Sequence, residues 1–139
     1  MVILDTNVIS ALMHQRPPLA VKQWLDRQPS LSVWTTSITV FEIRTGIDGL
    51  PAGRRRRSLE AEFARVIEDD MERRILSFDE AAANVAGALM AERKRTGRTG
   101  ELRDTMIAGI VIVSHAMLAT HNVRHFSDLS IALVNPWDS

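Results

Sequence analysis

Short apolar segments alternate with amphipathic ones along the chain, and this alternation predicts the fold. Residues 2–4 are wholly apolar and branched, which is typical of a strand buried on both faces of a parallel sheet. Four later segments predict further strands: 31–34, 75–78, 118–119 and 131–134. Helical patterns separate these strands, so we expect an α/β domain with a mostly parallel sheet.

Polar residues and prolines that can begin a helix stand before each helical segment. Asp5 follows the first strand as a candidate cap, and Pro17-Pro18 begins a second helix. Residues 35–37 precede a third helix that runs to Gly46 or Gly49, and Pro51 suits the first position of a long fourth helix. The core-facing side chains expected on these helices are Leu19, Val21, Trp24, Leu25, Ile38, Phe41, Ile47, Leu59, Phe63, Val66 and Ile67.

Two more helices are predicted in the second half of the chain. Asp79 caps an alanine-rich helix from Ala81 to about Arg95, and a strongly apolar helix extends from Leu102 to His115. There is no internal repeat or linker. The 139 residues are therefore expected to form one domain, 1–139.

Composition narrows the classes of protein. Lys and Arg number 17, as do Asp and Glu, so the net charge is zero and a strongly basic nucleic-acid binder is excluded. The chain has no cysteine, which excludes zinc–thiolate sites, cysteine nucleophiles and disulfides. No apolar stretch approaches the roughly 20 residues of a membrane helix, and the first residues lack a signal-peptide pattern. We therefore expect a cytoplasmic protein without a membrane segment.

Four oxygen-bearing side chains are expected at one edge of the sheet. In open parallel sheets, ligands bind outside the carboxyl ends of the strands. Residues at or near those ends, or at the start of a helix packed there, are Asp5, Glu42, Asp104 and Asn122. Oxygen ligands without His or Cys suit Mg²⁺ or Mn²⁺ rather than zinc. Such an ion can activate water for in-line displacement at a phosphate.

Each of these residues also has a structural interpretation. Asp5 can cap the next helix, and Glu42 can form a capping box with Thr39. Asp104 complements a helix N-terminus, and Asn122 is a common turn residue. Any one of them alone is explained in this way. Their joint placement at one sheet edge is what supports a metal site.

The motifs around these residues resemble those of PIN-domain ribonucleases, the VapC-type toxins of bacterial type II toxin–antitoxin modules. The resemblance spans the chain in four motifs, VILDTNVIS (2–10), TSITVFEIRTGI (36–47), RDTMIA (103–108) and LATHNVRHF (118–126). The closing NPW (135–137) is typical of the branch similar to the FitB toxin. The resemblance implies a five-stranded parallel sheet with helices on both faces.

The resemblance also implies roles for individual residues. The acidic ligands of Mg²⁺ or Mn²⁺ would be Asp5, Glu42 and Asp104. The fourth position often carries Asp in the family and here carries Asn122, which would act in catalysis by hydrogen-bonding a ligand or water. Thr6 and Thr120 would orient carboxylates. His121 stands where Arg is common after the threonine.

The function implied is that of a metal-dependent endoribonuclease, in which a Mg²⁺- or Mn²⁺-activated water hydrolyses an RNA phosphodiester. Its partners would be a cognate antitoxin protein and RNA, with a homodimer and a toxin–antitoxin hetero-oligomer as expected assemblies. The alternative is a catalytically silent PIN-like module that binds RNA or protein, an idea that Asn122 keeps open. An aspartyl-phosphate enzyme fits poorly, because residues 5–7 lack its second Asp.

Basic residues outside the four motifs offer further contacts. Four consecutive arginines oppose the dipole of the predicted fourth helix: Arg54, Arg55, Arg56 and Arg57. This unfavourable placement suggests contact with RNA or a partner protein, and the alternative is a run on a solvated surface. Arg98 and Arg103 lie near Asp104 and could guide phosphates. The remaining residues expected to have only structural or surface roles are Arg93, Lys94, Arg95, His14, His115, His121 and His125.

Overall fold

The computed structural model describes residues 1–98 and 100–138. Five strands form one sheet, and every pair is parallel. The strands are β1 (Val2–Leu4), β2 (Val33–Thr36), β3 (Ile75–Leu76), β4 (Met117–Ala119) and β5 (Ala132–Val134), in the spatial order β3-β2-β1-β4-β5. β1 is therefore the central strand, and the strand order reverses beside it. The predicted five-stranded parallel sheet is confirmed.

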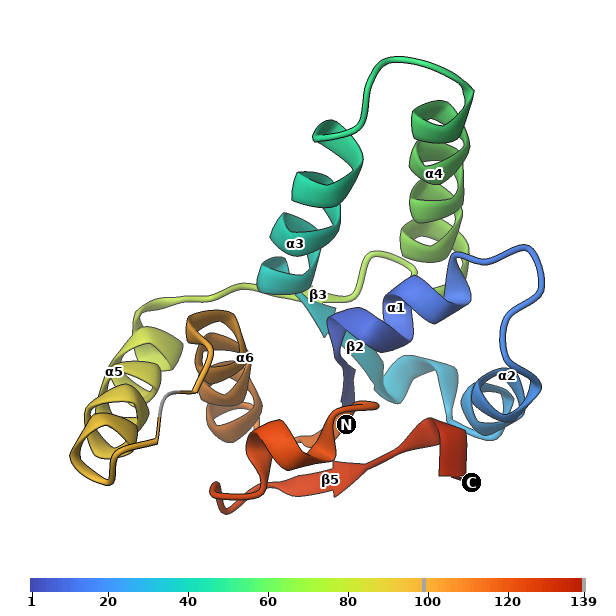
Figure 1. Cartoon of the computed structure of the whole chain (residues 1–139). Helices are drawn as coiled ribbons and strands as arrows, with labels where there is room; N and C mark the ends of the chain where they lie inside the picture. The colour runs from blue at the N-terminus through green and yellow to red at the C-terminus, as the bar shows by residue number, and fades with distance from the viewer. Residues whose placement is uncertain (99, 139) are drawn as a thin grey trace.

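Helices cover both faces of the sheet, as expected (Figure 1). They are α1 (Thr6–Leu12), α2 (Leu19–Asp26), α3 (Ser37–Asp48), α4 (Arg54–Arg65), α5 (Glu80–Arg95) and α6 (Leu102–Val113). Shorter helical turns are Ser30–Ser32, Val66–Asp70, Val123–Phe126 and Pro136–Asp138. Within the described ranges, no helix is long and apolar enough to cross a membrane.

The alternation of side chains along β1 divides the core in two. Val2 and Leu4 face a cluster built with α1, α2 and α4, whereas Ile3 faces a second cluster built with α5 and α6. All three side chains are almost completely buried. A wholly apolar strand is therefore explained by two covered faces.

Close packing of α5 and α6 depends on Gly109. A Cβ atom at this position would lie 2.6 Å from the carbonyl oxygen of Ala82 and 3.0 Å from the Cβ of Ala86. Small residues on both helices thus allow a backbone-to-backbone approach, which fixes α6 against α5.

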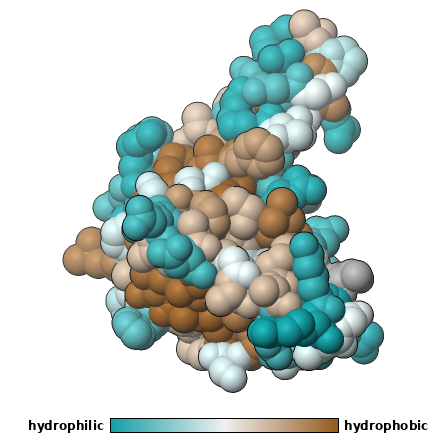
Figure 2. Space-filling view, turned by 90° about the vertical axis from the view of Figure 1, so that its left-hand side faces the viewer, coloured by the Kyte–Doolittle hydropathy of each residue, from teal (hydrophilic) through white to brown (hydrophobic). Residues whose placement is uncertain are grey.

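An arm formed by α3 and α4 rises from the body of the molecule (Figure 1). Figure 2 shows its end at the top, covered largely by hydrophilic residues. Ion pairs tie the two helices together, with Arg56 of α4 3.5 Å from Asp48 of α3 and Arg44 of α3 3.7 Å from Glu60 of α4.

Several predicted boundaries were wrong. The second strand is 33–36 rather than 31–34, because residues 30–32 form a helical turn that leaves Leu31 exposed. The third strand spans only two residues instead of 75–78. The fourth helix begins at Arg54, after Gly53, and not at Pro51. The sixth ends at Val113, and His115 lies beyond it with a positive φ of 51°.

Two predicted core residues face solvent. Leu19 is 68% exposed and Phe41 is 61% exposed. Positions two residues apart lie about 200° apart around a helix. Val21 on α2 and Ile43 on α3 face the core, so Leu19 and Phe41 point away from it.

Candidate functional site

A cavity of about 580 Å³ lies at the carboxyl edge of the sheet. The candidate residues that line it are Asp5, Thr6, Glu42, Asp104 and Asn122. Asp5 follows β1, Glu42 lies in the second turn of the helix after β2, and Asn122 follows β4. The sheet topology therefore brings together the oxygen-bearing side chains that were predicted to meet.

Asp5 is the most buried acid of this group, with 4% of its surface exposed. Its Oδ1 accepts a hydrogen bond of 2.8 Å from the amide of Thr6, and its Oδ2 accepts one of 2.7 Å from the hydroxyl of Thr120. The Nδ2 of Asn7 donates to the same Oδ2 at 3.4 Å. Asp5 is thus both the cap of α1 and a carboxylate held rigidly at the cavity wall.

Glu42 is held by a threonine from another element. The hydroxyl of Thr6 donates to its Oε1 at 2.8 Å. The alternative of a capping box between Thr39 and Glu42 is wrong, because Thr36 is the cap of α3 and accepts the amide of Thr39 at 3.2 Å. With its other oxygen, Glu42 lies 3.8 Å from the Nε of Arg103.

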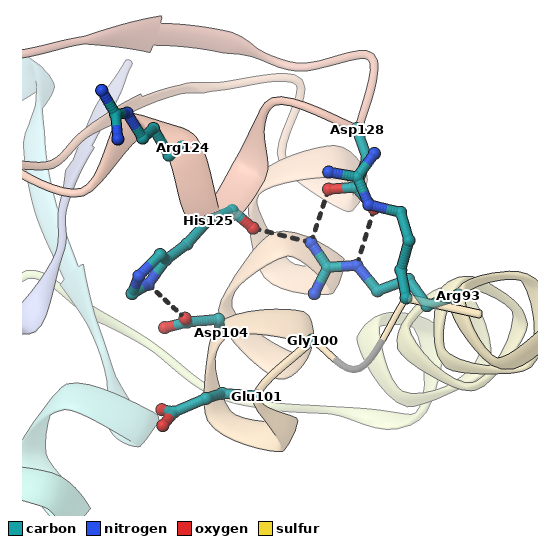
Figure 3. Close-up of a pocket in the computed structure, with 8 residues that line it drawn as sticks. Arg93, Gly100, Glu101, Asp104, Arg124, His125 and Asp128 are labelled. Atoms are coloured by element: carbon teal, nitrogen blue, oxygen red, sulfur yellow. Dashed lines mark hydrogen bonds and ion pairs between the residues drawn. The ribbon is translucent and has the colours of Figure 1, made fainter. Parts of the chain in front are cut away.

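Asp104, in the first turn of α6, contacts His125. Its Oδ2 lies 3.0 Å from the Nδ1 of His125 (Figure 3). The prediction of a merely structural or surface role for His125 missed this contact with a candidate ligand. No spacing signal connects them, since His125 lies on the turn Val123–Phe126, 21 residues further along the chain.

Burial shifts the titration of two of the acids. It raises the pKa of Asp5, although the hydrogen bond from Thr120 opposes this, and the charge of Asp104 raises it further. Burial likewise raises the pKa of Asp104, against the hydrogen bond with His125. Two carboxylates that disfavour ionisation and repel each other across one cavity indicate a site suited to a cation.

The donor set fits a hard divalent cation. The wall offers carboxylate and amide oxygens, which Mg²⁺ and Mn²⁺ prefer. Among the residues that the structure describes, no three His, Asp or Glu side chains converge closely enough to hold an ion between them. Asp5, Glu42 and Asp104 line one cavity without enclosing a common point. Mg²⁺ commonly keeps waters in several positions, which is compatible with such spacing.

Comparison with known proteins matches residues 2–131 to the PIN domain. This chain belongs to the PIN-domain family. It is 33% identical to the VapC ribonuclease Y4jK of Sinorhizobium fredii over 138 residues, covering 99% of both chains. It is 31% identical to the toxin FitB of Neisseria gonorrhoeae over 137 residues, again covering 99% of each. A structure of FitAB bound to an IR36 DNA fragment contains a similar chain, with a TM-score of 0.86 and 31% identity over 99% of this chain and 96% of that one.

Around the cavity of this PIN domain, the predicted basic residues separate into groups. Arg103 lies beside Glu42, and Arg98 lies 3.9 Å from Asp128. Arg55 lines a neighbouring cavity of about 410 Å³ that Glu42 and Arg103 also line. Arg54 and Arg57 are exposed on α4. The four arginines of the run 54–57 therefore lie in different surroundings.

Arg93 corrects another expectation. Its place near the end of α5 suggested a surface residue, yet only 3% of it is exposed. Its guanidinium forms an ion pair with Asp128 at 2.9 Å. Nothing in the local sequence distinguishes Arg93 from Lys94 and Arg95, which are exposed on the same turn.

Proposed function

We propose that this PIN domain is a metal-dependent endoribonuclease and the toxin of a type II toxin–antitoxin pair. The observation that carries the proposal is the cavity in which Asp5, which is buried, and Asp104, which is partly buried, both have raised pKa values and lie beside Glu42. The similarity to proteins named VapC ribonuclease and toxin FitB supports both the activity and the biological role.

Asp5, Glu42 and Asp104 would hold Mg²⁺ or Mn²⁺ in this site. The bound ion would supply positive charge for the phosphoryl transition state and make water more acidic. Thr120 and Thr6 orient Asp5 and Glu42 through their hydroxyl groups. Asn122 places an amide at the same cavity without adding charge.

The partner we propose is an antitoxin protein. The similar chain of known structure occurs in a complex named FitAB, bound to DNA. By analogy, we expect this chain to form a hetero-oligomer with its antitoxin, and a homodimer within it. Because RNA and a toxin–antitoxin complex are found in the bacterial cytoplasm, we propose that the protein acts there.

A cleavage assay on single-stranded RNA, with and without EDTA, tests the proposed activity. We expect cleavage that EDTA abolishes and that added Mg²⁺ or Mn²⁺ restores. Asp5→Asn protein serves as the control for contaminating ribonuclease. RNA binding without cleavage in any divalent ion would instead support the catalytically silent module.

A further inference from the structure

Arg93 is the most extensively bonded buried side chain near the site, and its bonds reach three residues on two segments, α6 and residues 125–128. Its Nε and Nη2 donate to the two carboxylate oxygens of Asp128, each at 2.9 Å. Nη2 also donates to the carbonyl oxygen of His125 at 2.8 Å, and Nη1 donates to the hydroxyl of Thr105 at 2.8 Å. Figure 3 shows the guanidinium between Asp128 and the turn that carries His125.

These bonds restrain the two segments that carry Asp104 and His125, whose side chains contact each other in the candidate site. Thr105 is the residue next to Asp104 on α6, and the backbone of His125 is bonded directly. The side chains of Asp104 and His125 meet 3.0 Å apart. A single guanidinium therefore fixes the helix turn that carries Asp104 relative to the turn that carries His125.

Gly100, two residues before α6, lies against the guanidinium of Arg93. A Cβ at Gly100 would lie 2.1 Å from the Nη1 of Arg93 and 2.7 Å from its Cζ. Only glycine fits without displacing the guanidinium. Gly100, the arginine and the start of α6 are thus packed as one unit.

The chemistry of this unit favours a geometric role over a stabilising one. A buried ion pair adds little net stability compared with apolar packing, because both charges lose their hydration. Arginine, however, presents a rigid planar fork that bonds a carboxylate through two nitrogens, which lysine cannot reproduce. The pKa of Asp128 is lowered, chiefly by its hydrogen bond from Arg93, so this carboxylate is charged at neutral pH.

We propose that Arg93, paired with Asp128, is a positioning residue that sets the placement of Asp104 and His125 at the cavity. This inference rests on the proposed function for its catalytic consequence, but its geometric part can be measured without it. Arg93 does not line the cavity of about 580 Å³. It lines an adjoining cavity of about 280 Å³ that Asp104 and His125 also line, so it acts through these two residues.

The test compares Arg93→Lys with Arg74→Lys as a matched control. Arg74 is another largely buried arginine, with 10% of its side chain exposed, and its Nε donates to the carbonyl of Val33 at 2.7 Å. Val33 begins β2, so this contact lies at the opposite edge of the sheet from the cavity. The control therefore measures how the loss of a buried guanidinium changes the stability of the protein when the candidate site is not affected.

We expect Arg93→Lys to lower Mn²⁺ affinity, measured by calorimetry, and kcat by about 10–100-fold, with little change in KM. Amide hydrogen exchange should accelerate at residues 102–105 and 123–126. Arg74→Lys should leave Mn²⁺ affinity, kcat and hydrogen exchange at these residues unchanged. Its melting temperature should be comparable to that of Arg93→Lys. Gly100→Ala, which keeps every charge and displaces the guanidinium, should reproduce the defects of Arg93→Lys if it folds.

Unaltered exchange at residues 102–105 and 123–126 in folded Arg93→Lys protein would overturn the positioning role. Equal losses of Mn²⁺ affinity and kcat in Arg93→Lys and Arg74→Lys would also overturn it. If wild-type protein neither binds Mn²⁺ nor cleaves RNA, the proposed function fails, and the exchange comparison still decides the geometric role of Arg93.

Discussion

The hydroxyl of Thr120 donates a hydrogen bond of 2.7 Å to the carboxylate of Asp5, across 115 positions of sequence. The two residues directly follow β4 and β1, which pair in parallel with Leu4 opposite Ala119. The amide of Asp5 also donates to the carbonyl of Ala119 at 2.9 Å. The ladder of the sheet thus extends into the candidate site and fixes the orientation of its most buried acid.

Replacement of Thr120 by valine should impair this site. Valine keeps the shape but removes the hydroxyl, which also accepts the Nδ2 of Asn7 and the amide of Asn122. Leaving buried polar groups unpaired costs about 1–3 kcal/mol of folding stability. Mn²⁺ affinity and cleavage should fall about 10–100-fold because Asp5 loses its orienting donor. Urea unfolding and calorimetry measure both effects, and Thr120→Ser should remain near wild type. Wild-type behaviour of Thr120→Val would remove the orienting role.

Asp104→Asn should abolish cleavage yet raise stability at neutral pH. Burial raises the pKa of Asp104 above its ordinary value of 3.8, so ionising it costs the folded state free energy. As the pH rises, that cost begins near the ordinary pKa of 3.8 and reaches its full size above the raised pKa. The advantage of the asparagine variant should therefore be present at pH 7 and disappear as the pH falls below about 3.8. Thermal unfolding across pH checks this, and an unchanged difference at low pH would contradict it.

Asp5→Asn should lose cleavage too, but without the same gain in stability. Both carboxylate oxygens of Asp5 accept hydrogen bonds, one from the amide of Thr6 and the other from Thr120. An amide NH₂ group would face one of these donors. The measurement is the difference in unfolding free energy between the Asp5→Asn and Asp104→Asn proteins at pH 7. A greater stabilisation in Asp5→Asn than in Asp104→Asn would show that burial outweighs the lost acceptor.

The acids of the site could be predicted from sequence because their position follows from topology. Parallel strands end at one edge, so Asp5 and the residues after β2 and β4 had to meet there. The contacts of His125 and Arg93 could not be predicted. Both depend on how α5, α6 and the turn 123–126 pack, and no periodicity in the sequence records that packing.

The error at Phe41 has a different origin. The helix itself was predicted, but its core face was assigned from apolar residues without their angular positions. Ile43, which lies about 200° from Phe41, is buried in the core cluster that also contains Leu4 of β1 and Val8 of α1. Apolar character alone therefore did not decide burial on α3.

The arginine run on α4 should act through Arg55 rather than as a whole. Arg55 lines the cavity next to Glu42, whereas Arg56 pairs with Asp48 and Glu60. Arg55→Gln should weaken binding of single-stranded RNA and reduce its salt-dependence slope by about 0.7. Exposed Arg57 provides the matched control, and Arg57→Gln should have little effect. If Arg55→Gln instead leaves RNA binding intact and weakens the antitoxin complex, the residue serves the partner.

Asn122 offers the sharpest test of how the cavity holds a cation. It lines the cavity with Asp5 and Asp104, and its amide N–H donates to the hydroxyl of Thr120 at 3.0 Å. Its side chain brings an oxygen but no charge, so the acids supply most of the attraction for the ion. We predict that Asn122 hydrogen-bonds a water on the ion or one of the acidic ligands.

Asn122→Ala should therefore leave a weakened nuclease, about 10–100-fold slower and partly rescued by raised Mn²⁺. Asn122→Asp should retain activity and bind divalent ions more tightly, because it adds a negative charge facing the cavity. Its folding without metal should become less stable, since a further negative charge then faces the cavity that Asp5, Glu42 and Asp104 line. Calorimetric Mn²⁺ titration of the three proteins separates these outcomes. Equal affinities in wild type, Asn122→Ala and Asn122→Asp would leave this residue only its backbone role in the turn after β4, where its carbonyl oxygen accepts the amide of His125 at 3.0 Å.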